Sequence, residues 1–170
     1  KLSSLSIIEP GELKNFDVST LKEKYPWFKA NSLEGFLLPD TYNFFAASSV
    51  DLVVQKLLDS FSSKVLPFFG NYSSILSTIN LASILEKEVP EYNDRRIVAG
   101  ILIKRLAEKM PLQVDATIIY IKCSAKFSDC PGLQREDYKI DSPYNTYLHL
   151  GLPKTPISNP SLDAIKAALN

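Results

Sequence analysis

The stretch LASILEKEVP, residues 81–90, decides the fold because it joins a helical apolar pattern to two acids, Glu86 and Glu88. The spacing of its apolar residues predicts a helix from about Ser73 to Glu88. Pro90 ends that helix because proline cannot continue the hydrogen-bond ladder. Burying an ionised carboxylate costs several kcal/mol unless the group is paired, so the two acids need an explanation.

The helical period turns Glu86 inward. At about 100° per residue, Glu86 falls within one narrow apolar stripe. The other members of that stripe are Ile75, Ile79 and Ala82. Glu88 lies well round from the stripe, on the side of Leu81 and Ile84. The most polar side of the predicted helix consists of Asn80, Ser83 and Lys87.

An inward-facing Glu86 has two explanations. It forms an ion pair in the core with an arginine, for which Arg95, Arg96 and Arg105 are available. Alternatively, desolvation raises the pKa of its carboxyl, which keeps a proton available for donation to a leaving oxygen near neutral pH. The same region offers a structural role for Glu88, which is predicted to pair with Arg95 or Arg96.

The composition excludes several classes of function. The chain has 170 residues with nineteen basic and nineteen acidic side chains, so no basic surface indicates nucleic-acid binding. No apolar run approaches a membrane span, and no signal-peptide pattern opens the chain. The single histidine, His149, stands without a nucleophile motif, and there is no glycine-rich phosphate loop. No metal or cofactor is predicted, which leaves acid–base catalysis by carboxylates.

Two cysteines, Cys123 and Cys130, lie in the polar stretch IKCSAKFSDCPG. The spacing is compatible with a small-loop disulfide and equally with two free thiols, and both remain open. A disulfide would favour an oxidising compartment.

Two longer helices are predicted on either side of the quoted stretch. The first begins at Ser49, and its apolar stripe consists of Val50, Val53, Val54, Leu57, Leu58 and Phe61. The second lies in DRRIVAGILIKRLAEK, residues 94–109, with Asn93 or Asp94 as its N-cap. Ile97, Ile101 and either Leu102 or Lys104 set a helical face within it.

Shorter elements complete the predicted fold. Asp115 is expected to cap a helix that begins at Ala116, and Asn159 to cap the final helix with Pro160 at its first position. Short strands are expected near residues 110–115 and in the loop after 142. The predicted class is α+β, mostly helical with a few short strands.

Four segments carry a resemblance to a known family. They are EGFLLPDTYNF at 34–44, LASILEKEV at 81–89, VAGILIKRLAEKMPLQVDATIIY at 98–120 and SPYNTYLHLGLPKTPISNPSLDAIKAAL at 142–169. Together they resemble the MltG (YceG-like) family of endolytic murein transglycosylases over most of residues 33–170. The resemblance implies a catalytic domain over 32–170 that continues beyond Asn170. Residues 1–31 would then be a connector or the tail of a LysM-like module.

The resemblance also implies an enzyme, a peptidoglycan lytic transglycosylase. It would cut the β-1,4 bond between N-acetylmuramic acid and N-acetylglucosamine and leave 1,6-anhydromuramic ends. Glu86, the first glutamate of the A-S-I-x-E-K-E motif, would act as acid and base. The substrate contacts expected in the groove are Glu34, Gln113, Asp115, Tyr144, Asn145 and Tyr147. For each of these a purely structural role is an open alternative, as helix cap, loop former or packing residue.

The family setting implies a location and partners. The chain would act in the cell envelope, on the periplasmic face of the inner membrane, attached only through an N-terminal anchor that the chain does not contain. Peptidoglycan strands are the expected partner, with peptidoglycan synthases as further partners. Lys154 departs from the family pattern, which usually has a second proline there. The alternative function is a non-catalytic glycan-binding or scaffolding module of the cell-wall synthesis machinery.

Overall fold

The computed structural model describes residue 8 and residues 11–13, 15–45 and 47–169, and it is helical. Five α-helices lie within these residues: α1 Val50–Lys64, α2 Ile75–Glu88, α3 Tyr92–Ala107, α4 Asp115–Lys122 and α5 Leu162–Ala168. The same residues contain four short 3-10 helices: η2 Val18–Leu21 before α1, η3 Leu66–Phe68 between α1 and α2, and η4 Phe127–Asp129 and η5 Asp137–Lys139 between α4 and α5. Part of the predicted N-terminal connector, residues 1–7, 9–10 and 14, falls outside the described residues.

The predicted α+β class is wrong, because no β-strand occurs in the described residues. The two segments in which short strands were expected do touch: the Gln113 amide donates to the Thr146 carbonyl at 3.0 Å. The next amide, Val114, donates instead to the Thr146 side-chain Oγ1. A β-ladder needs repeated exchange between backbone groups, and a side chain takes the second bond here. The segments are therefore extended loops.

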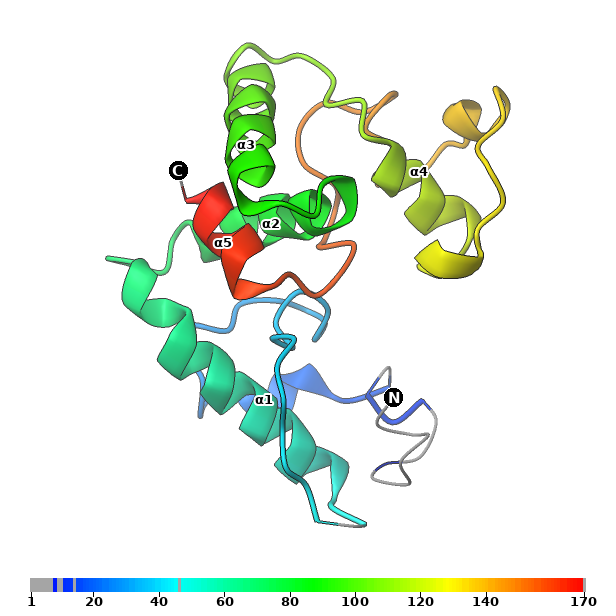
Figure 1. Ribbon diagram of the computed structural model, residues 1–170. Helices are drawn as coiled ribbons and strands as arrows, with labels where there is room; N and C mark the ends of the chain where they lie inside the picture. Colours follow the sequence, from blue (N-terminus) through cyan, green and yellow to red (C-terminus); the bar gives the residue numbers. More distant parts are fainter. Residues whose placement is uncertain (1–7, 9–10, 14, 46, 170) are drawn as a thin grey trace.

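Helix α2 is the centre of the fold. Figure 1 shows α2, α3 and α5 gathered together, α1 on one side of them and α4 on another. The apolar residues Ile75, Ile79 and Ala82 of α2 are buried as predicted. Asn80 and Ser83, which the helical period placed on its polar side, are buried as well. The polar side expected in solvent is covered because the C-terminal loop bonds to it. The Ile157 amide donates to Ser83 Oγ, and Ser158 Oγ donates to the Ser83 carbonyl.

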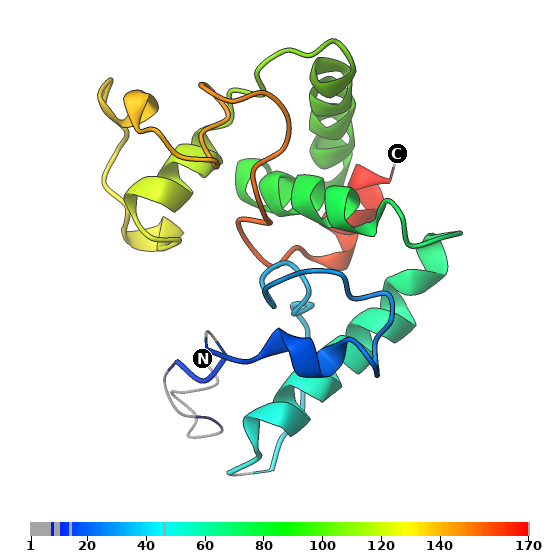
Figure 2. The ribbon, with the colours of Figure 1, turned by 180° about the vertical axis from the view of Figure 1, so that it is seen from behind.

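Helix α1 confirms its prediction. Ser49 is the N-cap, with Oγ accepting from the Leu52 amide, and the buried positions are Val53, Val54, Leu57, Leu58 and Phe61. From behind, Figure 2 shows the N-terminal segment with η2 lying along α1. Trp27 stacks on Phe61 with ring centroids 5.0 Å apart, and Tyr25 donates to Asp59 at 2.8 Å. Aromatic packing of this kind joins the N-terminal loops to the helical core.

Three of the predicted N-caps are wrong. Helix α3 follows Glu91, α4 follows Val114, and α5 follows Ser161, whose Oγ accepts from the Ala164 amide. The predicted cap Asn159 has another task, since its Oδ1 accepts from the amides of Gly35 and Leu37. Capping side chains bind whichever unpaired amide lies nearest in space, and here that amide belongs to a distant segment.

Gly35 is required where these two segments meet. Its φ is +95°, a conformation that glycine adopts without a Cβ penalty. A Cβ at this position would lie 2.6 Å from the Pro156 ring. The glycine therefore lets residues 32–38 lie directly against the loop that leads into α5.

The helical face that Ile97 and Ile101 set is not the buried face of α3. Ile97 and Ile101 are 63% and 51% exposed, whereas Arg95, Ala99 and Leu102 are buried. Arg95 sets the orientation, because its Nε donates to the Val89 carbonyl and its Nη1 donates to Ser161 Oγ. Two side-chain bonds to the core thus outweigh the apolar pattern of the isoleucines.

We expect Ile97→Gln to change the free energy of unfolding by no more than about 0.5 kcal/mol, as is usual for exposed positions. Leu102→Ala, on the opposite side of α3, should cost clearly more because it leaves a cavity. Urea unfolding of both variants measures the difference. A large loss in Ile97→Gln would contradict the orientation of α3 described above.

Across the described residues, no helix combines the length and the apolar character needed to cross a bilayer.

Candidate active site

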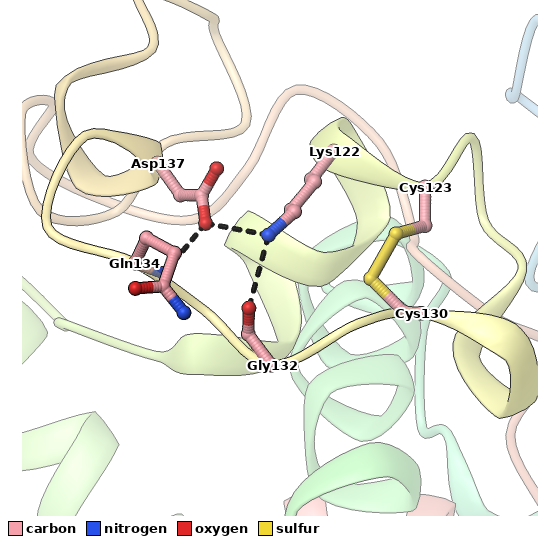
Figure 3. Close-up of a disulfide and its surroundings, with 6 residues drawn as sticks. All are labelled: Lys122, Cys123, Cys130, Gly132, Gln134 and Asp137. Carbon is pink, nitrogen blue, oxygen red and sulfur yellow. Dashed lines mark hydrogen bonds and ion pairs between the residues drawn. A yellow bond between two sulfur atoms is a disulfide. The ribbon is translucent and has the colours of Figure 1, made fainter.

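The segment after α4 is held by a disulfide and an ion pair. Cys123, which follows the last residue of α4, is bonded to Cys130, so the alternative of two free thiols is wrong. Figure 3 shows that Lys122 beside this disulfide contacts Asp137, at 2.7 Å, and donates to the Gly132 carbonyl. Asp137 begins η5, so these bonds fix η5 against α4.

Glu88 reaches the first turn of α4. Its Oε1 accepts a hydrogen bond from the Ala116 amide at 3.2 Å, which gives α4 the cap that Val114 does not supply. Glu88 is the last residue of α2, and it is exposed, so an incoming ligand can reach the carboxyl. The end of one helix and the start of another therefore meet at this group.

The surroundings of Glu88 favour its protonated form. Partial burial raises the pKa of the Glu88 carboxyl, and the neighbouring charge of Asp115 raises it further. The hydrogen bond from the Ala116 amide lowers the pKa, and its influence is smaller than that of burial and larger than that of the Asp115 charge. A carboxyl that is reachable and retains its proton above its ordinary range is suited to donate that proton.

Asp115 and two tyrosines surround the same point. The Tyr147 hydroxyl donates to Asp115 Oδ1 at 2.5 Å, and the rings of Tyr138 and Tyr147 meet edge to face with centroids 4.8 Å apart. Burial raises the pKa of both phenols, and the Asp115 carboxylate adds to this effect. Both phenols therefore remain neutral and can serve as hydrogen-bond donors at neutral pH.

Gln113 lies at the edge of this cluster in a strained backbone conformation. Its φ is +55°, which is uncommon for a residue with a side chain. The Gln113 amide donates to the Thr146 carbonyl, and its exposed side chain lies 3.5 Å from Arg105 Nη1. The backbone bond to Thr146 holds the strained residue in place. The side-chain amide of Gln113 lies at the surface.

Asn145 holds the loop that carries Tyr138 and Tyr147. It is fully buried, its Nδ2 donates to the carbonyls of Tyr138 and Ile140, and its Oδ1 accepts from the Tyr147 amide. All of these bonds shape the loop that carries the two tyrosines. The structural alternative for Asn145, a loop former, fits these contacts.

Glu34 and Tyr144 belong to a second cluster, which forms around Tyr120 of α4. The Tyr120 hydroxyl donates to Glu34 Oε2 at 2.7 Å, and the Tyr144 ring lies 4.9 Å from the Tyr120 ring. Burial raises the pKa of Glu34, partly offset by the bond from Tyr120. Tyr120 lies one helical turn beyond Ala116, on the same face of α4. Glu34 also lines a cavity of about 560 Å³.

Glu86 lies elsewhere, at the junction of α2, α3 and α5. Its Oε2 accepts from the Ser161 amide at 3.0 Å and from Ser161 Oγ at 2.6 Å, and it lies 3.4 Å from Arg95 Nη2. The ion pair that the sequence offered as an explanation is therefore present. Since Arg95 pairs with Glu86, the pairing predicted for Glu88 with Arg95 is wrong.

The seven residues expected at the site thus fall into different surroundings. Asp115 and Tyr147 lie beside Glu88, Gln113 precedes Asp115 by two residues, and Asn145 holds the loop that carries Tyr147. Sequence reasoning missed Glu88, Tyr138 and Tyr120. A signal for Glu88 was present, because its neighbours on the helical wheel, Leu81 and Ile84, are as apolar as those of Glu86.

Comparison with known proteins gives consistent results. A sequence model of the YceG-like family matches residues 4–170. A relative from Streptococcus pneumoniae, named endolytic murein transglycosylase, is 34% identical over 145 residues, 81% of this chain and 26% of its own length. A Bacillus subtilis relative of the same name is 32% identical over 167 residues, 90% of this chain and 45% of its own.

A solved structure is similar as well. The crystal structure of a YceG-like protein from Listeria monocytogenes has a TM-score of 0.77 and 29% identity, covering 99% of this chain and 56% of that one. The chain therefore spans less than half the length of the two curated relatives named above. Since the family match extends over nearly the whole sequence and both relatives exceed 30% identity, this chain belongs to the YceG-like family.

Proposed function

We propose that this chain carries the catalytic centre of an endolytic murein transglycosylase and that Glu88 is its acid and base. The observation that supports this assignment is the environment of Glu88: a reachable carboxyl with a raised pKa, placed beside Asp115 at the start of α4. The role expected for Glu86 passes to Glu88, because Glu86 is engaged by Arg95 and Ser161.

The reaction needs only one carboxyl that acts twice. Protonated Glu88 gives its proton to the glycosidic oxygen as the muramic acid ring approaches an oxocarbenium-like state. The substrate's own 2-acetamido group can stabilise the anomeric carbon. Glu88, now a carboxylate, then takes the proton of the C6 hydroxyl as that oxygen bonds to the anomeric carbon. No water enters the product, and a 1,6-anhydro end results.

Other residues of the cluster bind and orient the glycan in this proposal. The side chains of Asp115 and Gln113 are exposed and suited to bond sugar hydroxyl or acetamido groups. Tyr147 and Tyr138 offer aromatic surface beside them. Tyr120, whose hydroxyl donates to Glu34, lies about 6 Å beyond Ala116 along α4, the rise of about one helical turn and the scale of the next sugar.

A hydrolase is the second candidate, and one observation favours it. The Asp115 carboxylate is close enough to Glu88 to raise its pKa, and ordinary glycosidases use two carboxyl groups. In that case Asp115 would activate water or attack the sugar. The bond from Tyr147 to Asp115 speaks against this role, since it occupies one Asp115 oxygen.

The decisive experiment is digestion of purified peptidoglycan followed by mass spectrometry of the products. Anhydromuramic ends inside the strands would support the proposal. Free reducing muramic acid ends would identify a hydrolase. Binding to the strands without cleavage by a folded protein would leave the scaffolding alternative.

The proposed setting is the cell envelope, outside the cytoplasm. The names of the relatives place their substrate in murein, and the Cys123–Cys130 disulfide is typical of proteins from oxidising compartments. The finer location, the periplasmic face of the inner membrane, and the expected peptidoglycan synthase partners remain proposals drawn from the family resemblance.

Activity should fall as the pH rises through the raised pKa of Glu88, because the donor must be protonated. Asp115→Asn removes one of the causes of the raised pKa while keeping an acceptor for Tyr147. The alkaline limb of kcat/KM should therefore move to lower pH in this variant. Measuring pH profiles of both proteins tests this, and an unmoved limb would contradict the assignment of Glu88.

A further inference from the structure

Two threonines that the proposed reaction does not use, Thr117 of α4 and Thr146 of the loop after 142, are buried. They are 0% and 2% exposed, and their hydroxyl oxygens lie 3.0 Å apart. Thr146 Oγ1 also accepts from the Val114 amide at 3.0 Å, and Thr117 Oγ1 donates to the Val114 carbonyl at 2.7 Å. A buried hydroxyl is unfavourable unless it is hydrogen bonded, and each of these two has two partners.

The number of available protons gives each of these bonds a direction. A hydroxyl has one proton to donate and two lone pairs that accept. The Thr117 proton is directed at the Val114 carbonyl, so the bond between the two hydroxyls takes its proton from Thr146. The Val114 amide thus donates to Thr146, Thr146 donates to Thr117, and Thr117 donates back to the Val114 carbonyl. This closed set of three bonds, the threonine ring, holds both backbone groups of Val114.

The same contact explains the strained backbone of Gln113. In an extended segment, successive amides point to opposite sides. The amides of Gln113 and Val114 instead both donate to Thr146, one to its carbonyl and the other to its hydroxyl. The backbone of Gln113 lies between these two amides, and its φ of +55° turns them to one side. Such a conformation persists where the surroundings hold it, and here Thr146 holds it at both amides.

The threonine ring lies next to both partners of a hydrogen bond in the cluster around Glu88. Val114 directly precedes Asp115 at the start of α4. Thr146 directly precedes Tyr147, whose hydroxyl donates to Asp115 at 2.5 Å. The amide that follows Asp115 donates to Glu88. The ring therefore joins the start of α4 to the loop that carries the tyrosine.

We propose that Thr146 and Thr117 are positioning residues. Through the threonine ring they hold Asp115 beside Glu88 and within reach of Tyr147. Because both threonines are buried, they act only through the residues that they hold. Their effect on cleavage rests on the proposed function, whereas their effect on the start of α4 stands on the contacts described above.

The first test measures hydrogen exchange of backbone amides in the whole chain by NMR, and it needs no substrate. Thr146→Val keeps the shape of the side chain and removes the acceptor of the Val114 amide. We expect the amides of Val114 and Ala116 to exchange about tenfold faster relative to those of α1, the factor that loss of a buried hydrogen bond gives. Thr146→Ser keeps the hydroxyl and should exchange as the parent does. Thr117→Val opens the ring while the Val114 amide keeps its acceptor, so it should accelerate Ala116 in a less perturbed protein.

Ser83→Ala is the matched control. Ser83 is also fully buried, and its hydroxyl accepts from the Ile157 amide at 3.0 Å, but it lies outside the threonine ring. This variant should accelerate exchange at Ile157 and leave Ala116 unchanged relative to α1. Equal acceleration of Ala116 in Thr146→Val and Ser83→Ala would overturn the proposal, since both would then act through a general loss of stability. Unchanged exchange of Ala116 in the two threonine-to-valine variants would overturn it as well.

Cleavage kinetics test the second step at a temperature where the variants are folded. Thr146→Val should lower kcat by about tenfold to a hundredfold, the scale of a misplacement of about 1 Å in a catalytic site. Thr146→Ser should restore the parental kcat. In a Tyr147→Phe background, Thr146→Val should lower kcat far less, because the bond that the ring supports is already missing. An equal loss in both backgrounds would contradict a role through Tyr147 and Asp115.

The two readouts separate this proposal from the proposed function. Faster exchange of Ala116 in a protein that cleaves no strands would support the threonine ring and contradict the catalytic assignment. Cleavage at the parental rate by folded Thr146→Val would support the catalytic assignment and contradict the ring as a positioning device.

Discussion

Glu88→Gln is expected to lower the rate of anhydromuramic end formation by roughly a thousandfold, the range typical for loss of a general acid–base group. Glutamine retains an oxygen that accepts from the Ala116 amide, so α4 keeps its cap. Because the pKa of Glu88 is raised in the folded protein, folding disfavours its ionised form. The contribution of Glu88 to the free energy of unfolding therefore declines as the pH rises above the pKa that this carboxyl has in the unfolded chain. A neutral side chain should therefore not destabilise the protein at neutral pH.

The measurement is product mass spectrometry on defined glycan strands, together with urea unfolding of the same samples. Glu91→Gln is the matched control, because Glu91 is exposed, lies three residues further along, and makes no side-chain cap bond. More than about a tenth of the parental rate in Glu88→Gln would exclude it as the acid, since such a loss is smaller than acid–base groups provide.

Glu86→Gln is expected to have the opposite profile: a loss of about 2 kcal/mol in the free energy of unfolding, with cleavage per folded molecule retained. Removing this charge leaves the buried Arg95 guanidinium without its carboxylate. It also weakens the bonds from Ser161, which hold the start of α5. Glu86 is 23% exposed, so solvent screening limits the loss below that of a fully buried pair.

Denaturant unfolding and activity at a temperature where the variant is folded separate these effects. Glu108→Gln is the control, because its pairing with Lys104 at 3.9 Å is exposed and should matter little. If folded Glu86→Gln lost cleavage while Glu88→Gln retained it, the assignment made from the sequence would be right and the one made from the structure wrong.

The sequence predicted the buried residues of a helix that has one buried side and one exposed side. Helix α1 has an apolar side and a wet side, so its period identified its buried residues. Helix α2 does not follow this rule, because Asn80 and Ser83 bond to a loop more than seventy residues away. A helical wheel assumes one exposed side along the whole helix and cannot represent a helix whose middle turns, Ile79 to Leu85, are buried on every side.

The choice of Glu86 as the acid rests on the same kind of local pattern and stays a prediction. Periodicity recognised correctly that Glu86 faces the interior, but a buried acid is either paired or reactive, and only its partners decide which. Those partners, Arg95 and Ser161, come from α3 and the start of α5. The surroundings of Glu88 come likewise from α4 and the loop after 142, which no local pattern places beside it.

Glu88 caps α4, and this has a consequence for the energetics of proton transfer. The start of a helix carries roughly half a positive charge from its aligned peptide dipoles. When Glu88 releases its proton, negative charge develops where the Ala116 amide points. In the proposed reaction this hydrogen bond is weak toward the neutral acid and becomes strong as the proton leaves, so α4 would bind the transition state better than the ground state. A helix of eight residues would in this way lower the barrier without touching the sugar.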